Sequence, residues 1–145
     1  MSQSPASSKP YALVVDDDGL IRMNAMDILE EAGFRTFEAS DGDTAMALLD
    51  AQNALIVLLF TDVHMPGSRN GFAVARETAR QWPHISIVVA SGEAQPGPGD
   101  LPDGARFVGK PFSAAMIHNH LAEILPDGQK PEPLRNKIDQ KRQAR

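Results

Sequence analysis

Short apolar runs alternate with amphipathic stretches along most of the chain. Residues 11–15 and 55–61 are almost continuously apolar, which is typical of strands buried on both faces of a sheet. Residues 20–32 instead carry apolar side chains at helical spacing, and Gly33 follows them as a helix-ending glycine does. The pattern predicts strands at 11–15, 34–39, 55–61, 85–90 and 105–109, and helices at 20–32, 41–51, 71–82 and 114–125.

This alternation of strands and helices indicates the α/β class. Consecutive strands joined through helices form right-handed βαβ units, so the strands are expected to run parallel in one sheet. In sheets of this kind, functional residues gather where the strands end. The side chains directly after each apolar run are therefore the candidate site.

Residues 92–104 depart from the helical pattern. This segment holds three prolines and four glycines in thirteen residues, and it has almost no apolar face. Proline costs about 3 kcal/mol and glycine about 1 kcal/mol inside a helix. We therefore expect the helix between the last two strands to be missing or reduced to a turn, and the segment to act as a flexible switching loop.

The alternating strands and helices lie in residues 11–125, which we assign to one domain. Both ends of the chain differ from this domain. Residues 1–10 are rich in serine and proline and are predicted to be a disordered lead. Residues 126–145 are predicted to be a basic, flexible tail that is partly helical after Leu134. The pattern leaves two interpretations of this tail open, a solvated end and a segment that docks on a partner or a membrane surface.

Composition excludes several functions. The chain has no cysteine, which excludes disulfides, cysteine-ligated zinc, iron–sulfur clusters and a thiol nucleophile. The net charge of −5 argues against a nucleic-acid binder that relies on bulk charge, so no nucleic-acid partner is expected. No apolar run is long enough for a transmembrane helix, and the polar N-terminus lacks a secretory h-region. We therefore expect a cytoplasmic protein.

Chemically useful side chains follow four of the five predicted strands. Asp16, Asp17 and Asp18 follow the first, Asp62 the third, Ser91 the fourth and Lys110 the fifth. Clustered carboxylates repel one another unless a cation is present, and all-oxygen ligands suit Mg²⁺ or Mn²⁺. A carboxylate beside such a metal can attack phosphorus, while a lysine and a hydroxyl contact the transferred group. The set predicts phosphoryl chemistry on an aspartate.

Four motifs carry a resemblance to a known family. Residues 14–18 (VVDDD), 61–67 (TDVHMPG), 90–92 (ASG) and 107–112 (FVGKPF) resemble the receiver domain of two-component response regulators. The resemblance covers about residues 12–125. It implies a flavodoxin-like (βα)5 three-layer sandwich with strand order 2-1-3-4-5, and a cis bond between Lys110 and Pro111.

The resemblance also implies a metal site. Asp62 matches the aspartate that accepts the phosphoryl group, and Asp17 and Asp62 match direct Mg²⁺ ligands. Asp16 matches the position that holds the metal through water, and the backbone carbonyl of His64 matches the third protein ligand. Asp18 has a simpler role, as the cap of the helix that begins near residue 20.

Further positions match the parts of the family that respond to phosphorylation. Ser91 matches the hydroxyl that meets the phosphoryl group, and Lys110 matches the lysine that pairs with it. Phe107 matches the aromatic switch position. His118 and His120 have no counterpart in the motifs and are expected on the surface of the last helix.

Together these matches predict a single-domain response regulator. A histidine kinase or a histidine phosphotransfer protein is the expected donor, and a downstream protein is the expected target, without a DNA-binding output domain. A phosphorelay intermediate, a phosphate sink and a homodimer remain open. We expect no activity as an enzyme beyond self-catalysed phosphorylation and dephosphorylation. A haloacid dehalogenase-like phosphatase would need an aspartate where His64 stands, and a flavin module would have its phosphate repelled by Asp16–Asp18.

Overall fold

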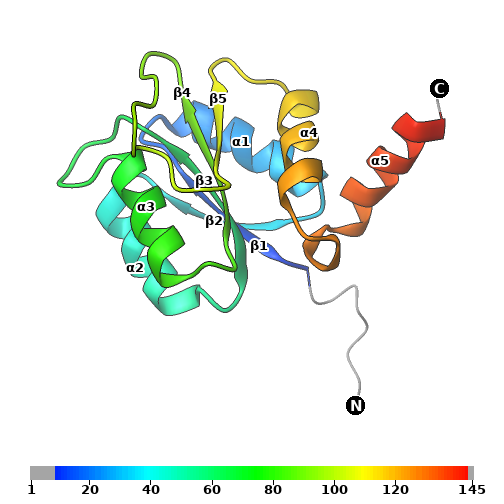
Figure 1. The fold of residues 1–145 in the computed structure, drawn as a ribbon, viewed down its shortest axis with the longest axis horizontal. Coiled ribbons are helices and arrows are strands. Elements are labelled where there is room, and N and C mark those ends of the chain that lie inside the picture. Colours follow the sequence, from blue (N-terminus) through cyan, green and yellow to red (C-terminus); the bar gives the residue numbers. More distant parts are fainter. Residues whose placement is uncertain (1–8, 144–145) are drawn as a thin grey trace.

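The computed structural model describes residues 9–143 and consists of one five-stranded sheet covered by helices on both faces (Figure 1). All pairings are parallel, and the strand order is β2-β1-β3-β4-β5. The order expected for a flavodoxin-like fold is therefore confirmed. The strands are β1 (Tyr11–Val15), β2 (Arg35–Ala39), β3 (Ile56–Asp62), β4 (Ser86–Ser91) and β5 (Arg106–Gly109).

Two helices pack on each face because alternate strand residues point to opposite faces. Helices α1 (Gly19–Glu31) and α4 (Ala114–Ile124) cover one face, and α2 (Gly42–Gln52) and α3 (Gly71–Gln81) cover the other. In β1, Ala12 and Val14 contribute to the α1/α4 core, whereas Leu13 and Val15 contribute to the α2/α3 core. The result is the three-layer sandwich that the family resemblance implies.

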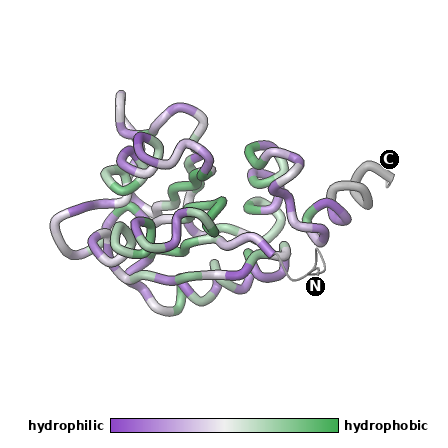
Figure 2. The backbone as a smooth tube through the Cα atoms, turned by 90° about the horizontal axis from the view of Figure 1, so that it is seen from below, coloured by the Kyte–Doolittle hydropathy of each residue, from purple (hydrophilic) through white to green (hydrophobic). Residues whose placement is uncertain are grey.

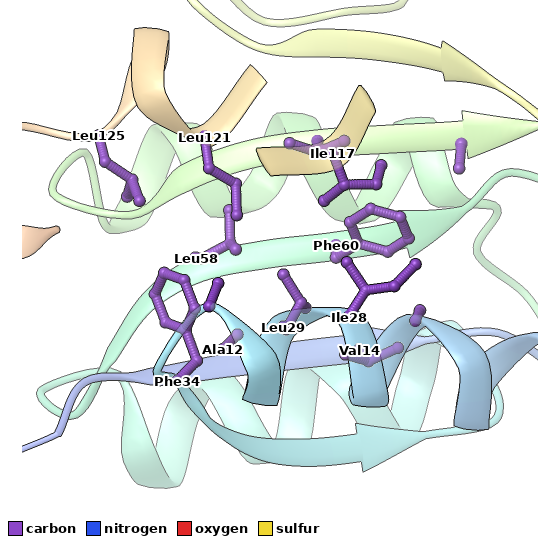
Figure 3. Close-up of a cluster of buried hydrophobic side chains, with 14 of the residues drawn as sticks. Ala12, Val14, Ile28, Leu29, Phe34, Leu58, Phe60, Ile117, Leu121 and Leu125 are labelled. Atoms are coloured by element: carbon purple, nitrogen blue, oxygen red, sulfur yellow. The ribbon is translucent and has the colours of Figure 1, made fainter. Parts of the chain in front are cut away.

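Figure 3 shows how the α1/α4 core is filled. Large side chains from both helices point toward the central strand β3, and each contributes about 1.5–3 kcal/mol when fully buried. The labelled residues of α1, α4 and β3 in this view are Ile28, Leu29, Leu58, Phe60, Ile117 and Leu121. This packing fixes α1 and α4 relative to the strand that ends in Asp62.

Side-chain caps fix where the helices begin. Asp18 accepts hydrogen bonds from the backbone of Leu20 and Ile21, so the predicted cap is confirmed, and Ser113 caps α4 by accepting one from Met116. Asn70 caps α3 through the backbone of Ala73. These helices begin in the loops that follow the strands, which are the loops that carry the candidate site.

The connection between β4 and β5 contains no helix. Residues 92–105 lie entirely within the described range and form bends and turns only. This confirms the missing helix expected from the proline and glycine content of the segment, while its role as a flexible switching loop stays a prediction. Arg76 of α3 holds the loop through the backbone oxygen of Asp100 at 3.3 Å and through its carboxylate at 3.8 Å. The loop is thus tethered to the α2/α3 face.

The C-terminal segment contains the helix that the sequence predicts in part, but it also contacts the core, which the expectation of a flexible tail did not include. It forms a short 3₁₀ turn (Asp127–Gln129) and helix α5 (Glu132–Gln143), which begins before Leu134 and extends away from the sheet (Figure 1). Leu134 is fully buried in the α1/α4 core, and Lys137 pairs with Glu31 at 3.1 Å. A leucine among mostly polar residues is too weak a pattern to predict this docking, and the coloured part of the segment in Figure 2 includes several hydrophilic residues.

Gly33 explains why this segment can approach the core. A Cβ atom at Gly33 would lie 2.6 Å from Pro131 Cβ and 2.9 Å from Pro133 Cδ, so only glycine fits beneath the two prolines. The expected disordered lead falls mostly on residues 1–8, which lie outside the described residues, as do residues 144–145. Within residues 9–143, no helix is both long and apolar enough to cross a membrane.

His118 is the second departure from expectation. The sequence places it on the surface of the last helix, but it is buried against α1. Its Nε2 lies 3.1 Å from the carbonyl oxygen of Ile28, to which it donates a hydrogen bond. Burial is possible because this bond satisfies the imidazole, so His118 is a packing residue of the α1/α4 core.

Candidate functional site

The predicted site residues meet at the carboxyl edge of the sheet. Asp62 and Ser91 are the last residues of β3 and β4, while Asp16 and Lys110 directly follow β1 and β5. Strand register brings them together, because Asp62 lies opposite Ala90 and Ser91 opposite Gly109. The Lys110–Pro111 bond is cis, as the family resemblance implies.

Lys110 links the two buried carboxylates of the site. Its Nζ donates to Asp16 Oδ2 and to Asp62 Oδ1, both at 3.0 Å. Burial lowers the pKa of Lys110, but the hydrogen bonds and charges of Asp16 and Asp62 outweigh it, and the net pKa is raised. Lys110 is therefore a fixed cation at neutral pH.

Burial raises the pKa of the Asp62 carboxyl group, whereas it lowers that of Lys110. The charge of Asp16 also raises the pKa of Asp62, and the hydrogen bond from Lys110 opposes both effects. Two carboxylates and one ammonium thus form a compact polar cluster at the end of β3. Asp16 and Asp62 are both buried, so little solvent screens their mutual repulsion.

Asp17 completes a group of three carboxylates. Asp16, Asp17 and Asp62 each offer one oxygen, and these oxygens lie within 4.8 Å of one another. One ammonium among three carboxylates leaves a net charge of −2, which a divalent cation would balance. All-oxygen donors of this kind fit Mg²⁺ or Mn²⁺. The side chain of His64 is exposed and does not belong to this group.

Ser91 connects the site to the following loop. Its Oγ accepts hydrogen bonds from the backbone of Ala94 at 2.9 Å and of Glu93 at 3.2 Å. Both bonds use the oxygen as acceptor, which leaves the hydroxyl hydrogen available to a further oxygen. The side chain of Ser91, the last residue of β4, therefore fixes the start of the loop.

Phe107 packs against the same core as the loop does. It is half-buried at the edge of the α2/α3 core, as are Ala94, Leu101 and Ala105. The loop thus contacts the α2/α3 core and hydrogen-bonds to Ser91. The assignment of Phe107 as an aromatic switch stays a prediction, as do the individual roles of the other site residues.

Gly71 is a site residue that the sequence did not reveal. It begins α3, and its backbone nitrogen donates to Val63 O at 2.8 Å. A Cβ atom at Gly71 would lie 1.8 Å from the backbone oxygen of Asp62. The only signal in the sequence is a glycine at a helix start, and such a glycine does not by itself indicate contact with a strand end.

Arg22 is a second residue that the sequence did not reveal. Its Nη1 donates to the backbone oxygen of Asp16, and its Nε pairs with Glu38 Oε1, both at 2.8 Å. These contacts depend on which way the first turns of α1 face. A lone arginine after an acidic run does not predict them.

Comparison with known proteins agrees with this geometry. The family model of the response regulator receiver domain matches residues 12–122. The sensor kinase CckA of Brucella abortus (strain 2308) is 28% identical over 122 residues, which cover 82% of this chain and 13% of that protein. The transcriptional regulatory protein DctD of Rhizobium meliloti (strain 1021), named for C4-dicarboxylate transport, is 33% identical over 119 residues, covering 77% of this chain and 24% of that protein. The chain spans no more than a quarter of either relative.

Solved structures share the fold. The receiver domain of the hybrid histidine kinase CckA superposes with a TM-score of 0.68 at 24% identity, covering 80% of this chain and 99% of that one. A response regulator receiver protein from Sinorhizobium medicae WSM419 gives a TM-score of 0.69 at 24% identity, covering 80% and 94%. A CheY-like protein from Methanospirillum hungatei JF-1 gives 0.68 at 21% identity, covering 79% and 92%.

Proposed function

Since the chain belongs to the receiver domains of two-component response regulators, we propose that Asp62 accepts a phosphoryl group from a phosphohistidine donor. The observation that carries this proposal is the surrounding of Asp62. Asp62 is the last residue of the central strand, and its carboxylate accepts a hydrogen bond from Lys110. One of its carboxylate oxygens lies within 4.8 Å of a carboxylate oxygen of Asp16 and of Asp17. An aspartate so placed beside a cation site can act as a nucleophile toward phosphorus.

The reaction transfers one group between two side chains. A carboxylate oxygen of Asp62 attacks phosphorus and forms an acyl phosphate P–O bond. The P–N bond to the donor imidazole breaks, and its electron pair stays on the nitrogen, which takes up a proton as the neutral ring leaves. Lys110, charged and 3.0 Å from the attacking carboxylate, is placed to pair with the new phosphoryl oxygens.

The acidic group is the proposed metal site. Asp17 and Asp62 would hold Mg²⁺ or Mn²⁺ directly, Asp16 through water, and His64 through its backbone carbonyl. When bound, the cation would neutralise charge on the transferred phosphoryl group. The support is the presence of three carboxylate oxygens close together with a single ammonium between them.

The response to phosphorylation is proposed to pass through Ser91. Its free hydroxyl hydrogen can donate to a phosphoryl oxygen, and movement of Ser91 would strain its two bonds to the loop. The loop lies against the edge of the core where Phe107 packs. The altered surface around the loop is where we expect a downstream protein to bind.

The donor is proposed to dock over α1 and the start of α4. Leu20 and Met23 of α1 are 79% and 58% exposed, which is unusual for large apolar side chains. A hollow of about 260 Å³ lies beside them, lined by Ile21, Asn24, Lys110, Pro111 and Phe112. Lys110 lines this hollow and bonds to Asp62, so the hollow lies next to the proposed phosphoacceptor, and a histidine kinase or phosphotransfer protein is the occupant that we propose.

Other expectations remain part of the proposal. A single-domain regulator without an output domain stays a prediction, because the relatives carry the matching segment within much longer chains. Cytoplasmic location stays a prediction as well, and so does the absence of enzymatic turnover on separate substrates. A role as phosphorelay intermediate or phosphate sink uses the same chemistry at Asp62.

Mass analysis after incubation with acetyl phosphate and Mg²⁺ tests the proposal. The wild type should gain the mass of one phosphoryl group, and it should gain none when EDTA replaces Mg²⁺. The Asp62→Ala variant should gain none, while the matched variant Asp50→Ala, at an exposed aspartate of α2, should behave as the wild type. An adduct on Asp62→Ala, or none on the wild type, would contradict the assignment.

A further inference from the structure

Arg22 connects three elements around the run of aspartates that follows β1, which we call the acidic loop. It lies in the first turn of α1, and its side chain is only 22% exposed. Nε pairs with Glu38 of β2 at 2.8 Å, and Nη1 donates to the backbone oxygen of Asp16, after β1, at 2.8 Å. Arginine suits this task because its planar guanidinium presents several donors in a fixed geometry.

Every polar atom of Asp16 has a partner, and each partner comes from a different place. The backbone nitrogen donates to Ala39 O, Oδ1 accepts from the backbone of Asp18, and Oδ2 accepts from Lys110. The backbone oxygen accepts from Arg22. This last bond alone acts on the peptide group that joins Asp16 to Asp17, so it sets the direction in which the chain enters Asp17.

Asp17 depends on this backbone for its position. Among the side chains of residues 9–137, no hydrogen bond or ion pair holds its carboxylate, in contrast to those of Asp16 and Asp62. Arg22 binds the residues on both sides of Asp17. Its side chain donates to Asp16 O, and its backbone nitrogen donates to Asp18 O at 2.9 Å.

Glu38 gives the arrangement a second purpose. An unpaired guanidinium beside the acidic loop would attract the carboxylates of Asp16 and Asp17 and compete with a divalent cation for them. Glu38 binds Arg22 from the β2 side and balances its charge. The pair therefore supplies a donor to the loop without adding net positive charge there.

From these contacts we propose that Arg22, held by Glu38, is a positioning residue of the cation site. It orients the peptide between Asp16 and Asp17 so that the unsupported carboxylate of Asp17 faces Asp16 and Asp62. The inference rests on the proposed function, because it assumes that the acidic group binds Mg²⁺. Groups that orient metal ligands typically change metal affinity about 10–100-fold when they are removed.

Direct titration of the metal-free protein with Mg²⁺ tests the inference. The Arg22→Met variant keeps the apolar stem but loses both donors, and its Kd for Mg²⁺ should rise about tenfold. Arg22→Lys can reach only one of the two partners at a time and should give an intermediate Kd. The matched control is Arg106→Met, which removes an ion pair of the same 2.8 Å length with Glu123. Its Kd should equal that of the wild type.

Amide exchange without metal gives an independent measurement. The backbone N–H of Asp18, bonded to Asp16 Oδ1, should exchange faster in Arg22→Met than in Arg106→Met. If Arg22→Met does not fold, Glu38→Gln carries the test, because it frees the guanidinium charge and should weaken Mg²⁺ binding several-fold.

The outcomes separate the two proposals. A wild type that does not bind Mg²⁺ would overturn the proposed function. A wild type that binds Mg²⁺, together with Arg22 and Glu38 variants that bind it equally well, would overturn only the positioning role. Equal weakening in Arg106→Met would also overturn it, since the effect would then come from general loss of stability.

Discussion

Gly71 leaves no room for a side chain beside the proposed phosphoacceptor. Helix α3 starts so close to the end of β3 that a methyl group at Gly71 would overlap the backbone oxygen of Asp62. The neighbouring bond from Gly71 N to Val63 O holds the two segments at this distance. Since both groups are backbone, neither can turn aside as a side chain would.

The substitution Gly71→Ala should therefore destabilise the protein by about 1–3 kcal/mol, the usual cost of overpacking a tight interior. It should also slow phosphorylation, because relief of the overlap displaces Asp62. Urea unfolding and acetyl phosphate labelling measure the two effects. Gly128→Ala is the control, since a Cβ atom there meets nothing within 4 Å. Equal stability of the two variants would contradict this account.

The residues at the strand ends show what could be predicted from the sequence. Asp16, Asp62 and Lys110 each follow an apolar run, and parallel strands bring such positions to one edge. The contacts of Gly71 and Arg22 could not be predicted in this way. They depend on how closely α3 approaches β3 and on which way α1 faces, and these distances arise from packing of the whole layer.

At the scale of elements, the loop between β4 and β5 is the most unusual part of the fold. Proline and glycine content alone predicted the loss of the helix, because their cost exceeds what so few apolar residues could offset. The sequence did not predict the tether between Arg76 and Asp100, nor the two bonds to Ser91. The loop therefore has defined contacts that phosphorylation could break.

Beryllofluoride, which mimics a phosphoryl group on an aspartate, should change amide exchange in this loop. When Ser91 turns toward the bound group, its bonds from the backbone of Glu93 and Ala94 weaken, and both amides should exchange faster. Amides inside α2 should be unaffected, and Asp62→Ala should show no change anywhere. Unchanged protection across residues 92–104 in the wild type would refute a loop-based signal.

At the scale of the whole molecule, α5 extends the core beyond the sheet and its four covering helices. Leu134 reaches the α1/α4 core, and the contact is possible because Gly33 has no side chain that would overlap the two prolines beside Leu134. The sequence could not predict this, because the segment is too polar and too poor in apolar residues to show the periodicity of an amphipathic face. The sequence did indicate the charge difference between this segment and the acidic body.

Leu134→Ala should lower the free energy of unfolding by about 2–5 kcal/mol, the typical cost of removing a buried leucine side chain. The control is Leu55→Ala, at a leucine that is 49% exposed, which should cost much less. Thermal unfolding in the metal-free state measures both. Equal effects would show that α5 is not docked on the core in solution. Because α5 begins far from the carboxyl edge, phosphorylation of Asp62 should persist in both variants.

The tethered loop between β4 and β5 also has a use in protein engineering. Gly99 has a φ of +81°, and a Cβ atom there would meet nothing within 4 Å, so the tip of the loop points into open space. Exposed loop tips of this kind accept inserted domains more readily than other positions do. A fluorescent protein inserted at Gly99 would sit eight residues after Ser91 and would leave the sheet intact. The receiver would then become the sensing half of a genetically encoded reporter.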